Sequence, residues 1–471
     1  MSVSARPSAA SSPARRILQQ SWPVLVGQWA GMAFGVLDTA MTGHASPVAL
    51  AAMALSVSIY VTVFVGLTGV LHALIPIAAQ HFGAGRLAQI GRAWGQAVWL
   101  ALGLSALGGA LMMFPGPWLS MSGDIAPEVR SQIEGYLHML VLALPAALVF
   151  RTVYALNTAV SRPKVVMTIN LAGIGAKALF NWLFIYGKLG LPALGAVGAG
   201  LSTALVFWLA VAVSAWVLWR DPFYRPFALR IGLPRWASLR ELLRLGVPMG
   251  GSYLVEVTSF TFMALLVARE GVYATGGHQI MANLIALCYM MPLSLGIASG
   301  ALTAQAIGAA DHERARRTGS AGLALALGGA AATIALVTAG RGWIVDAYTS
   351  DPRVAAVALG LLTMQPLFHF FDALQCCTSY LLRAYKIAVA PMLIQIGTLW
   401  GIGLLGGWWL GYGPAAGALA APLARIMPGA PTGAATLWLM ASVSIAVSGL
   451  MLQAWYRRVL RLRNPHSVTP A

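Results

Sequence analysis

The sequence predicts an all-α polytopic membrane protein, with twelve transmembrane helices in two parallel six-helix repeats. Three observations predict this fold class: an apolar composition, apolar runs of membrane-spanning length, and a match between the two halves of the chain. Of the 471 residues, 59% are hydrophobic and only 9% are charged, whereas soluble proteins carry about 25% charged residues. The composition therefore excludes a soluble enzyme with a large core.

Twelve apolar stretches, separated by glycine, proline and charged residues, are typical of helices that cross a bilayer. A crossing needs about 20 predominantly apolar residues. The predicted spans are residues 18–42, 48–78, 92–114, 133–156, 164–187, 195–219, 243–268, 278–308, 320–344, 354–382, 389–412 and 434–456.

Basic residues are distributed unevenly among the connections between these spans. Both termini and the even-numbered connections hold 22 of the 30 lysines and arginines, and the odd-numbered connections hold 6. This bias follows the positive-inside rule and predicts that both termini are cytoplasmic, in an inner (plasma) membrane. Because topology accounts for the net charge of +17, we expect no nucleic-acid partner.

The most basic connection lies near the middle of the chain and separates two sets of six spans. We therefore predict five segments: a cytoplasmic tail at 1–16, an N-terminal lobe at 17–219, a linker at 220–240, a C-terminal lobe at 241–456 and a second cytoplasmic tail at 457–471.

The two sets of spans are related in sequence. A shift of 225 residues pairs Pro23 with Pro248. A shift of 221 residues pairs three further sets: Pro145 with Pro366, Arg151 with Asp372 and Arg162 with Arg383. Because six is an even number, both copies have the same orientation in the membrane. Parallel repeats of this kind are typical of secondary transporters.

Three of the 13 acidic residues fall within the spans, namely Asp38, Glu256 and Asp372. A charge at the bilayer centre costs about 3 kcal/mol, so such a residue is expected to face a cavity, pair with a cation or take up a proton. A carboxylate poised in this way can exchange H⁺ or Na⁺ for a cationic solute, as an antiporter requires. The alternative is a structural carboxylate that caps a kink or pairs with a basic neighbour.

Polar and aromatic residues share a helix face with two of these carboxylates. Tyr253 lies three residues before Glu256, and His369 lies three residues before Asp372. Such faces suit a cavity that receives an aromatic cation. For His369 alone, a buried histidine with satisfied hydrogen bonds is the simpler interpretation.

Two basic residues also fall within spans. Lys177 lies four residues before Asn181 and therefore shares its face. Arg151 is expected nearer the cytoplasmic side, where its side chain can extend toward the membrane surface. The chain contains no GxSxG, HExxH or GxxxxGK[ST] pattern, so we expect neither an enzyme nor an ATP-driven pump, and no cofactor.

The residues around the carboxylates resemble the multidrug and toxic compound extrusion (MATE) transporters. PVLVGQWAGMAFGVLDTAMTGH (23–44) resembles their first helix, with Asp-Thr-x-Met-x-Gly after an early proline and glutamine. LGVPMGGSYLVEVTSFTF (245–262) resembles their seventh helix, and QPLFHFFDALQCCTSYLLRAYK (365–386) their tenth. The resemblance covers about residues 17–456, and the Asp-Ala-x-Gln with a later arginine indicates the NorM-like branch.

The resemblance implies a V-shaped pair of six-helix lobes in a transporter that exports cationic and amphipathic drugs in exchange for H⁺ or Na⁺. It implies an ion- and substrate-binding site at Glu256 and Asp372, which would also be the Na⁺ ligands, in the C-terminal lobe. It implies a second site at Asp38, Asn181 and Thr203 in the N-terminal lobe. We expect the chain to work as a monomer in the bilayer.

Two departures from the family pattern bear on the coupling ion. Phe368 stands where the tenth helix usually has a tyrosine, so it supplies no oxygen ligand. Lys177 stands where the fifth helix often has Asn or Asp, and its ammonium could pair with Asp38 in place of a coupling cation, a pairing that the sequence does not decide. Both departures favour H⁺ over Na⁺.

The alternative function is a flippase for lipid-linked precursors, from the same wider superfamily. Cavities of such flippases tend to be rich in basic residues that bind a pyrophosphate. Here three embedded acids stand against Lys177 and Arg151, which favours a cationic solute.

Overall fold

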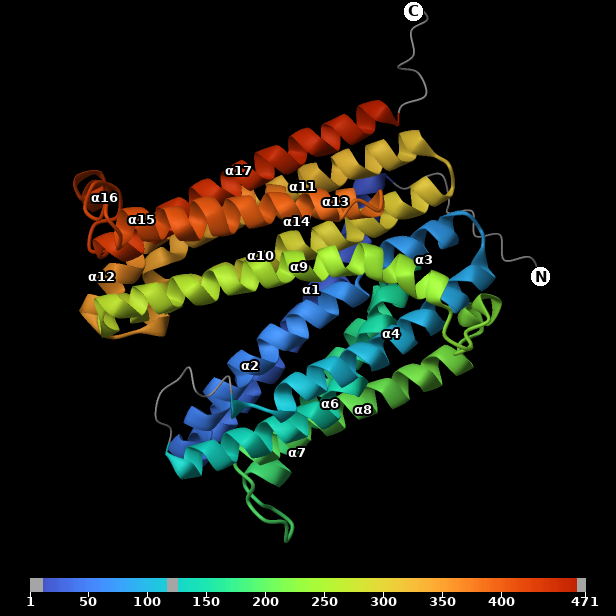
Figure 1. The fold of residues 1–471 in the computed structure, drawn as a ribbon, viewed down its shortest axis with the longest axis horizontal. Helices are drawn as coiled ribbons and strands as arrows, with labels where there is room; N and C mark the ends of the chain where they lie inside the picture. The colour runs from blue at the N-terminus through green and yellow to red at the C-terminus, as the bar shows by residue number, and fades with distance from the viewer. Residues whose placement is uncertain (1–11, 117–125, 464–471) are drawn as a thin grey trace, which may run out of the picture. The chain divides into compact units, whose positions relative to one another are not determined.

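The computed structural model describes residues 12–116 and 126–463 (Figure 1). Within these ranges the regular structure is helical and contains no strand. Twelve helical segments are long and apolar enough to cross a membrane, and each overlaps one predicted span, so the prediction of twelve spans is confirmed. Residues 1–11 and 464–471 of the predicted tails lie outside the described ranges. The last helix continues to Leu462, into the predicted second tail.

The described residues form two compact units. The N-terminal unit comprises Val26–Thr258 with Lys386–Met392, and the C-terminal unit comprises residues 12–25, Ser259–Tyr385 and 393–463. The unit boundaries therefore fall inside the first and seventh spans, which differs from the predicted lobes at 17–219 and 241–456.

The N-terminal unit is organised around α6, which packs against α2, α4 and α8. An apolar core of Met53, Val63, Ile133, Leu137 and Leu140, all less than 9% exposed, fills the space between these helices. The helices of this unit are α1 (Pro13–Ala45, from Val26), α2 (Pro47–Leu71), α3 (Leu74–Gly83), α4 (Leu87–Met113), α6 (Pro127–Ala159), α7 (Pro163–Ile185), α8 (Ala196–Arg220), η2 (Pro222–Phe227) and α9 (Trp236–Val267, to Thr258).

Close backbone packing explains why most of α9 groups with the N-terminal unit. Gly246 and Gly250 face α2, and a Cβ atom at either position would overlap a backbone carbonyl oxygen, that of Val70 or of Gly66. Because only glycine permits this approach, the seventh span is held against the second along one face.

The C-terminal unit is organised around α10 and α13, which pack against each other and against α11, while α13 also packs on α17. Its helices are η3 (Ala268–Glu270), α10 (Val272–Gly308), α11 (His312–Tyr348), α12 (Pro352–Leu361), η4 (Leu362–Met364), α13 (Gln365–Ala384), α14 (Val389–Gln395), η5 (Ile396–Gly406), α15 (Gly407–Gly411), α16 (Ala420–Ile426) and α17 (Thr432–Leu462).

Prolines explain two interruptions within predicted spans. Pro76 has no N–H to donate to the carbonyl of His72, and the second span breaks between α2 and α3 at that point. Pro366 likewise cannot donate to Leu362, where the tenth span tightens into η4. In the eleventh span, η5 is a π-helix of 11 residues, which the sequence did not predict.

The predicted linker packs against the N-terminal unit. In η2, Phe227 is only 1% exposed, and Gly91 of α4 lies so close that a Cβ there would overlap the Phe227 carbonyl oxygen. Farther along, Gln96 of α4 donates from Nε2 to the Leu233 carbonyl at 3.0 Å. The segment is therefore a docked part of this unit.

Asp221 holds the start of the linker in place through a hydrogen bond and an ion pair. Its carboxylate accepts a hydrogen bond from the Phe223 backbone N–H at 2.9 Å and forms an ion pair with Arg162. The Arg162 guanidinium also lies over the Phe223 ring, 4.5 Å from its centre. Burial alone raises the pKa of Asp221, but the hydrogen bonds from Phe223 and Arg162 outweigh burial and hold its pKa below the usual value.

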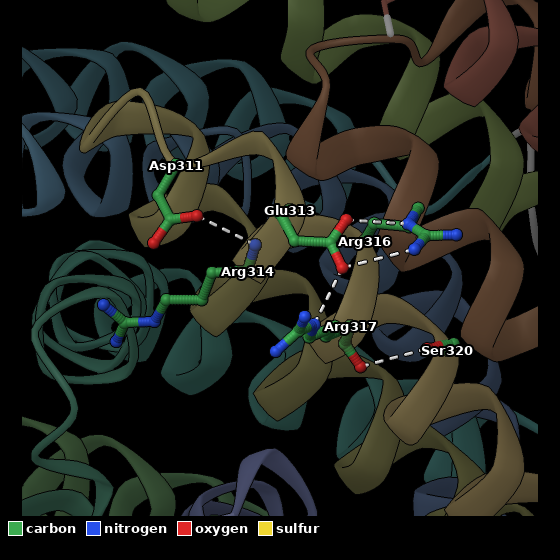
Figure 2. A network of polar contacts seen from close by, with 6 residues as sticks. All are labelled: Asp311, Glu313, Arg314, Arg316, Arg317 and Ser320. Atoms are coloured by element: carbon green, nitrogen blue, oxygen red, sulfur yellow. Dashed lines mark hydrogen bonds and ion pairs between the residues drawn. The ribbon is translucent and has the colours of Figure 1, made fainter. Parts of the chain in front are cut away.

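The start of α11 shows how basic residues are arranged in one predicted cytoplasmic connection (Figure 2). Asp311 caps the helix by accepting from the Arg314 backbone N–H at 2.9 Å, and Glu313 pairs with Arg316 at 3.0 Å and Arg317 at 2.7 Å. The side chains in these pairs are about half exposed or more, so the pairs contribute little stability. Their exposure fits a segment outside the hydrocarbon region.

Candidate functional site

Four of the predicted site residues meet in one buried cluster of the N-terminal unit. Asp38 comes from α1, Lys177 and Asn181 from α7, and Thr203 from α8. The Lys177 ammonium lies 2.8 Å from Asp38 Oδ1, and Asn181 Nδ2 donates to the same oxygen at 2.8 Å. The contact between Lys177 and Asp38, which the sequence left undecided, is therefore present.

The Lys177 ammonium is fully coordinated by oxygen atoms. Besides Asp38, it donates to Thr203 Oγ1 at 2.6 Å and to the Ala199 carbonyl at 3.1 Å. An ammonium has three N–H donors, and these three oxygens use all of them. Thr203 in turn donates to Ala199 at 3.0 Å, which fixes its hydroxyl as an acceptor toward the lysine.

Burial makes this pair electrostatically strong. Lys177 is 1% exposed and Asp38 is 7% exposed, so water screens neither charge appreciably. Removing one partner of a buried pair typically costs about 3–5 kcal/mol because the other charge is left uncompensated. The arrangement places an ammonium where carboxylate, hydroxyl and carbonyl oxygens converge, which is also the ligand set that hard cations prefer.

In the C-terminal unit, Asp372 lies on the buried face of α13 and is 3% exposed. His369, one turn earlier, is fully buried, and neither ring nitrogen has a hydrogen-bond partner among the described residues. The side-chain amide of Gln365, a further turn earlier, also has no hydrogen-bond partner among the described residues. His369 therefore has no protein partner among the described residues, and α13 carries a row of buried polar groups that leads to Asp372.

Phe368 belongs to an aromatic cluster rather than to a polar site. Its ring lies 6.0 Å from that of Phe260 and 5.7 Å from that of Trp438, measured between centres. The Trp438 indole donates to His278 Nδ1 at 3.2 Å. Phe260 and Phe368 also line an apolar pocket with Gly403 of η5. At the position where a tyrosine was expected, the Phe368 ring therefore packs against other aromatic rings and offers no hydroxyl.

Glu256 lies on α9 and is partly exposed, one turn after Tyr253. The Tyr253 hydroxyl lies 3.2 Å from His72 Nδ1, within the N-terminal unit. Glu256 and Asp372 belong to different compact units, and their common cation site stays a prediction.

Sequence reasoning missed two members of these clusters. The sequence could not indicate the Ala199 carbonyl as a ligand, because every residue has a backbone carbonyl. His72 did have a signal, because it lies four residues before Pro76, where a proline interrupts a helix and frees polar groups.

Comparison with known families agrees with this architecture. The family model described as MatE matches the chain twice, over residues 23–183 and 248–409. The two matches begin at Pro23 and Pro248, 225 residues apart, and confirm the predicted internal repeat.

Related sequences align over most of the chain. The probable multidrug resistance protein NorM of Aromatoleum aromaticum is 39% identical over 464 residues, covering 98% of this chain and 97% of the relative. The multidrug resistance protein MdtK of Yersinia pseudotuberculosis is 32% identical over 400 residues, covering 84% and 88% of the two chains.

Solved structures share the fold. The crystal structure of the eukaryotic MATE transporter AtDTX14 matches with a TM-score of 0.83 at 18% identity, covering 96% of this chain and 98% of that one. An outward-facing multidrug resistance MATE family transporter of the MOP superfamily matches with a TM-score of 0.83 at 16% identity, covering 96% and 97%. Family model, relatives and fold agree that this chain is a multi-pass membrane protein and a NorM-like member of the MatE family of MATE transporters.

Proposed function

We propose that this protein exports cationic and amphipathic aromatic compounds from the cytoplasm in exchange for protons. Its relatives are named as multidrug resistance proteins, which favours drug efflux over the transfer of lipid-linked precursors. In keeping with the bias of basic residues, the protein would lie in the inner membrane with both termini in the cytoplasm.

The exchange of proton for drug is assigned to Glu256 and Asp372. An acidic side chain buried in a span is costly unless it is protonated or paired with a cation. Such a carboxylate can therefore hold a proton in one step of the transport cycle and a cationic drug in another. Asp372 is 3% exposed on α13, beside the buried His369. Glu256 on α9 is partly exposed, so burial argues for proton exchange more strongly at Asp372 than at Glu256.

One observation carries the preference for protons over sodium. The Lys177 ammonium already takes the three oxygens of Asp38, Thr203 and Ala199 at 2.6 to 3.1 Å. A sodium ion at this position would have to displace a positive charge that is attached to the chain. The cluster in the N-terminal unit would therefore bind no sodium.

The coupling ion can be tested in proteoliposomes that hold ethidium. For the wild type we expect transport driven by a pH gradient and unchanged by a sodium gradient. Lys177→Asn removes the ammonium and supplies an amide oxygen, so sodium should then stimulate transport. Lys164→Asn, an exposed position on the same helix, is the matched control and should leave the ion dependence unchanged. Wild-type transport driven by sodium alone would contradict the proposal.

Asp372→Asn tests the exchange site separately. The amide keeps the shape of the side chain but cannot alternate between charged and neutral forms. We expect it to abolish ethidium efflux from cells at unchanged protein level. Efflux at the wild-type rate would remove Asp372 from the mechanism.

A further inference from the structure

Arg151 of α6 lies among aromatic side chains of the N-terminal unit. Its guanidinium carbon lies 5.5 Å from the ring centre of Phe64 and 5.8 Å from that of Tyr154. Phe64 is stacked on Tyr60, with ring centres 5.2 Å apart and an angle of 14° between the planes. The arginine is partly buried rather than extended into open surroundings.

No described carboxylate forms an ion pair with this arginine. The ion pairs of the described residues involve other bases, and Arg151 Nε is buried without a hydrogen-bond partner there. A guanidinium stays protonated, so the positive charge is permanent. Contacts with aromatic faces compensate a buried cation only in part. The charge therefore lacks a negative partner within the described residues.

Two tyrosine hydroxyls lie in the same cluster. Tyr60 Oη is buried and has no hydrogen-bond partner among the described residues, and Tyr154 Oη is buried beside Thr158. A guanidinium and two phenol groups together present donors to one region. The ligand that satisfies such a set is an anion with two acceptor oxygens, for which arginine is well shaped.

The internal repeat gives independent support. The shift that pairs Pro145 with Pro366 pairs Arg151 with Asp372, so equivalent helix positions carry opposite charges. The acid in one copy suits a cationic group, and the arginine in the other copy suits an anionic one.

We propose that Arg151, Tyr60 and Tyr154 form a binding site for the carboxylate of aromatic substrates that carry one, with Phe64 and Tyr60 as a stacking surface for the ring. This inference rests on the proposed export function and adds a determinant of substrate class to it. The same chemistry would also accept the phosphate of a lipid headgroup, which the experiment must separate from a substrate.

A matched pair of dyes tests the site. Rhodamine 110 carries a free carboxylate, and rhodamine 123 is its methyl ester, a cation with the same ring system. Binding of both to the purified full chain is measured by fluorescence polarisation in lipid-free non-ionic detergent. Arg151→Gln should weaken rhodamine 110 about tenfold or more and leave rhodamine 123 within about twofold. Arg151→Lys, which keeps the charge, should give an intermediate loss.

Two further variants control the result. Tyr154→Phe keeps the ring and removes one donor, so it should weaken only rhodamine 110, and it serves if Arg151→Gln fails to fold. Arg353→Gln removes an exposed arginine that lies 4.0 Å over the ring of Tyr273, and it should change neither dye.

Several outcomes would overturn the inference. Equal weakening of both dyes by Arg151→Gln would indicate a merely structural role. Unchanged rhodamine 110 binding in Arg151→Gln and Tyr154→Phe, with rhodamine 123 bound normally, would refute the site and leave the proposed function intact. A difference between wild type and Arg151→Gln that is seen only with added phosphatidylglycerol would identify a lipid site instead. Failure of the wild type to bind either dye would refute both the site and the proposed function.

Discussion

Lys177→Met provides a direct test of the buried cluster. Methionine fills a similar volume but has no ammonium, so Asp38 loses its cation and keeps the hydrogen bond from Asn181 at 2.8 Å. The variant loses the ion pair at 2.8 Å and the bonds to Thr203 and Ala199. The carboxylate, 7% exposed, would be left buried beside an apolar side chain.

Two magnitudes distinguish the interpretations of this cluster. Breaking one side of a buried ion pair costs about 3–5 kcal/mol. A neutral hydrogen bond between transmembrane helices contributes only about 0.6 kcal/mol. We therefore expect Lys177→Met and Asp38→Asn each to lower the free energy of unfolding by about 3–5 kcal/mol. The double variant should cost clearly less than the sum, because neither charge is then left alone.

The free energy of unfolding can be measured by titrating the micelle-bound protein with sodium dodecyl sulfate and following tryptophan fluorescence. Lys164→Met, at an exposed position of α7, is the control and should have little effect. A loss near 0.6 kcal/mol for Lys177→Met, or additive losses in the double variant, would refute an ionised pair between Asp38 and Lys177.

Three other predictions concern single residues. His369→Leu should raise the free energy of unfolding by about 1–3 kcal/mol, since two buried ring nitrogens without partners are removed, and should reduce ethidium transport; a destabilised variant would contradict this. Because the pKa of Asp221 is lowered in the folded protein, its contribution is present above the unfolded pKa of about 4 and is lost as the pH falls through the lower folded pKa. This can be measured with pepsin, because trypsin is inactive at such low pH. Pepsin cleavage of the wild type between residues 220 and 240 should increase as the pH falls. Cleavage of Asp221→Asn should depend less on pH. Gly91→Ala should undock the linker by its overlap with the Phe227 carbonyl and expose residues 220–240 to trypsin at neutral pH, whereas Gly103→Ala, with open space around it, should not.

The sequence was sufficient for the twelve spans because apolar length is a strong signal in a bilayer. Helix spacing placed Lys177 and Asn181 on one face, but the pairing of Lys177 with Asp38 was raised by the family resemblance and needed the structure to decide it. The sequence did not predict the π-helical segment Ile396–Gly406, because local composition does not distinguish hydrogen bonds five residues apart from those four apart. Nor did it predict the grouping of α9 with the N-terminal unit, which depends on the close approach of backbones at Gly246 and Gly250.

Lys177 also has a consequence for how the cluster responds to its surroundings. A ligand joined to the chain has a fixed effective concentration, which no dilution of the medium can lower. The three oxygens around the Lys177 ammonium are therefore occupied to the same extent at low and at high salt concentration. Free ions can leave a site when their supply falls, but a tethered one cannot.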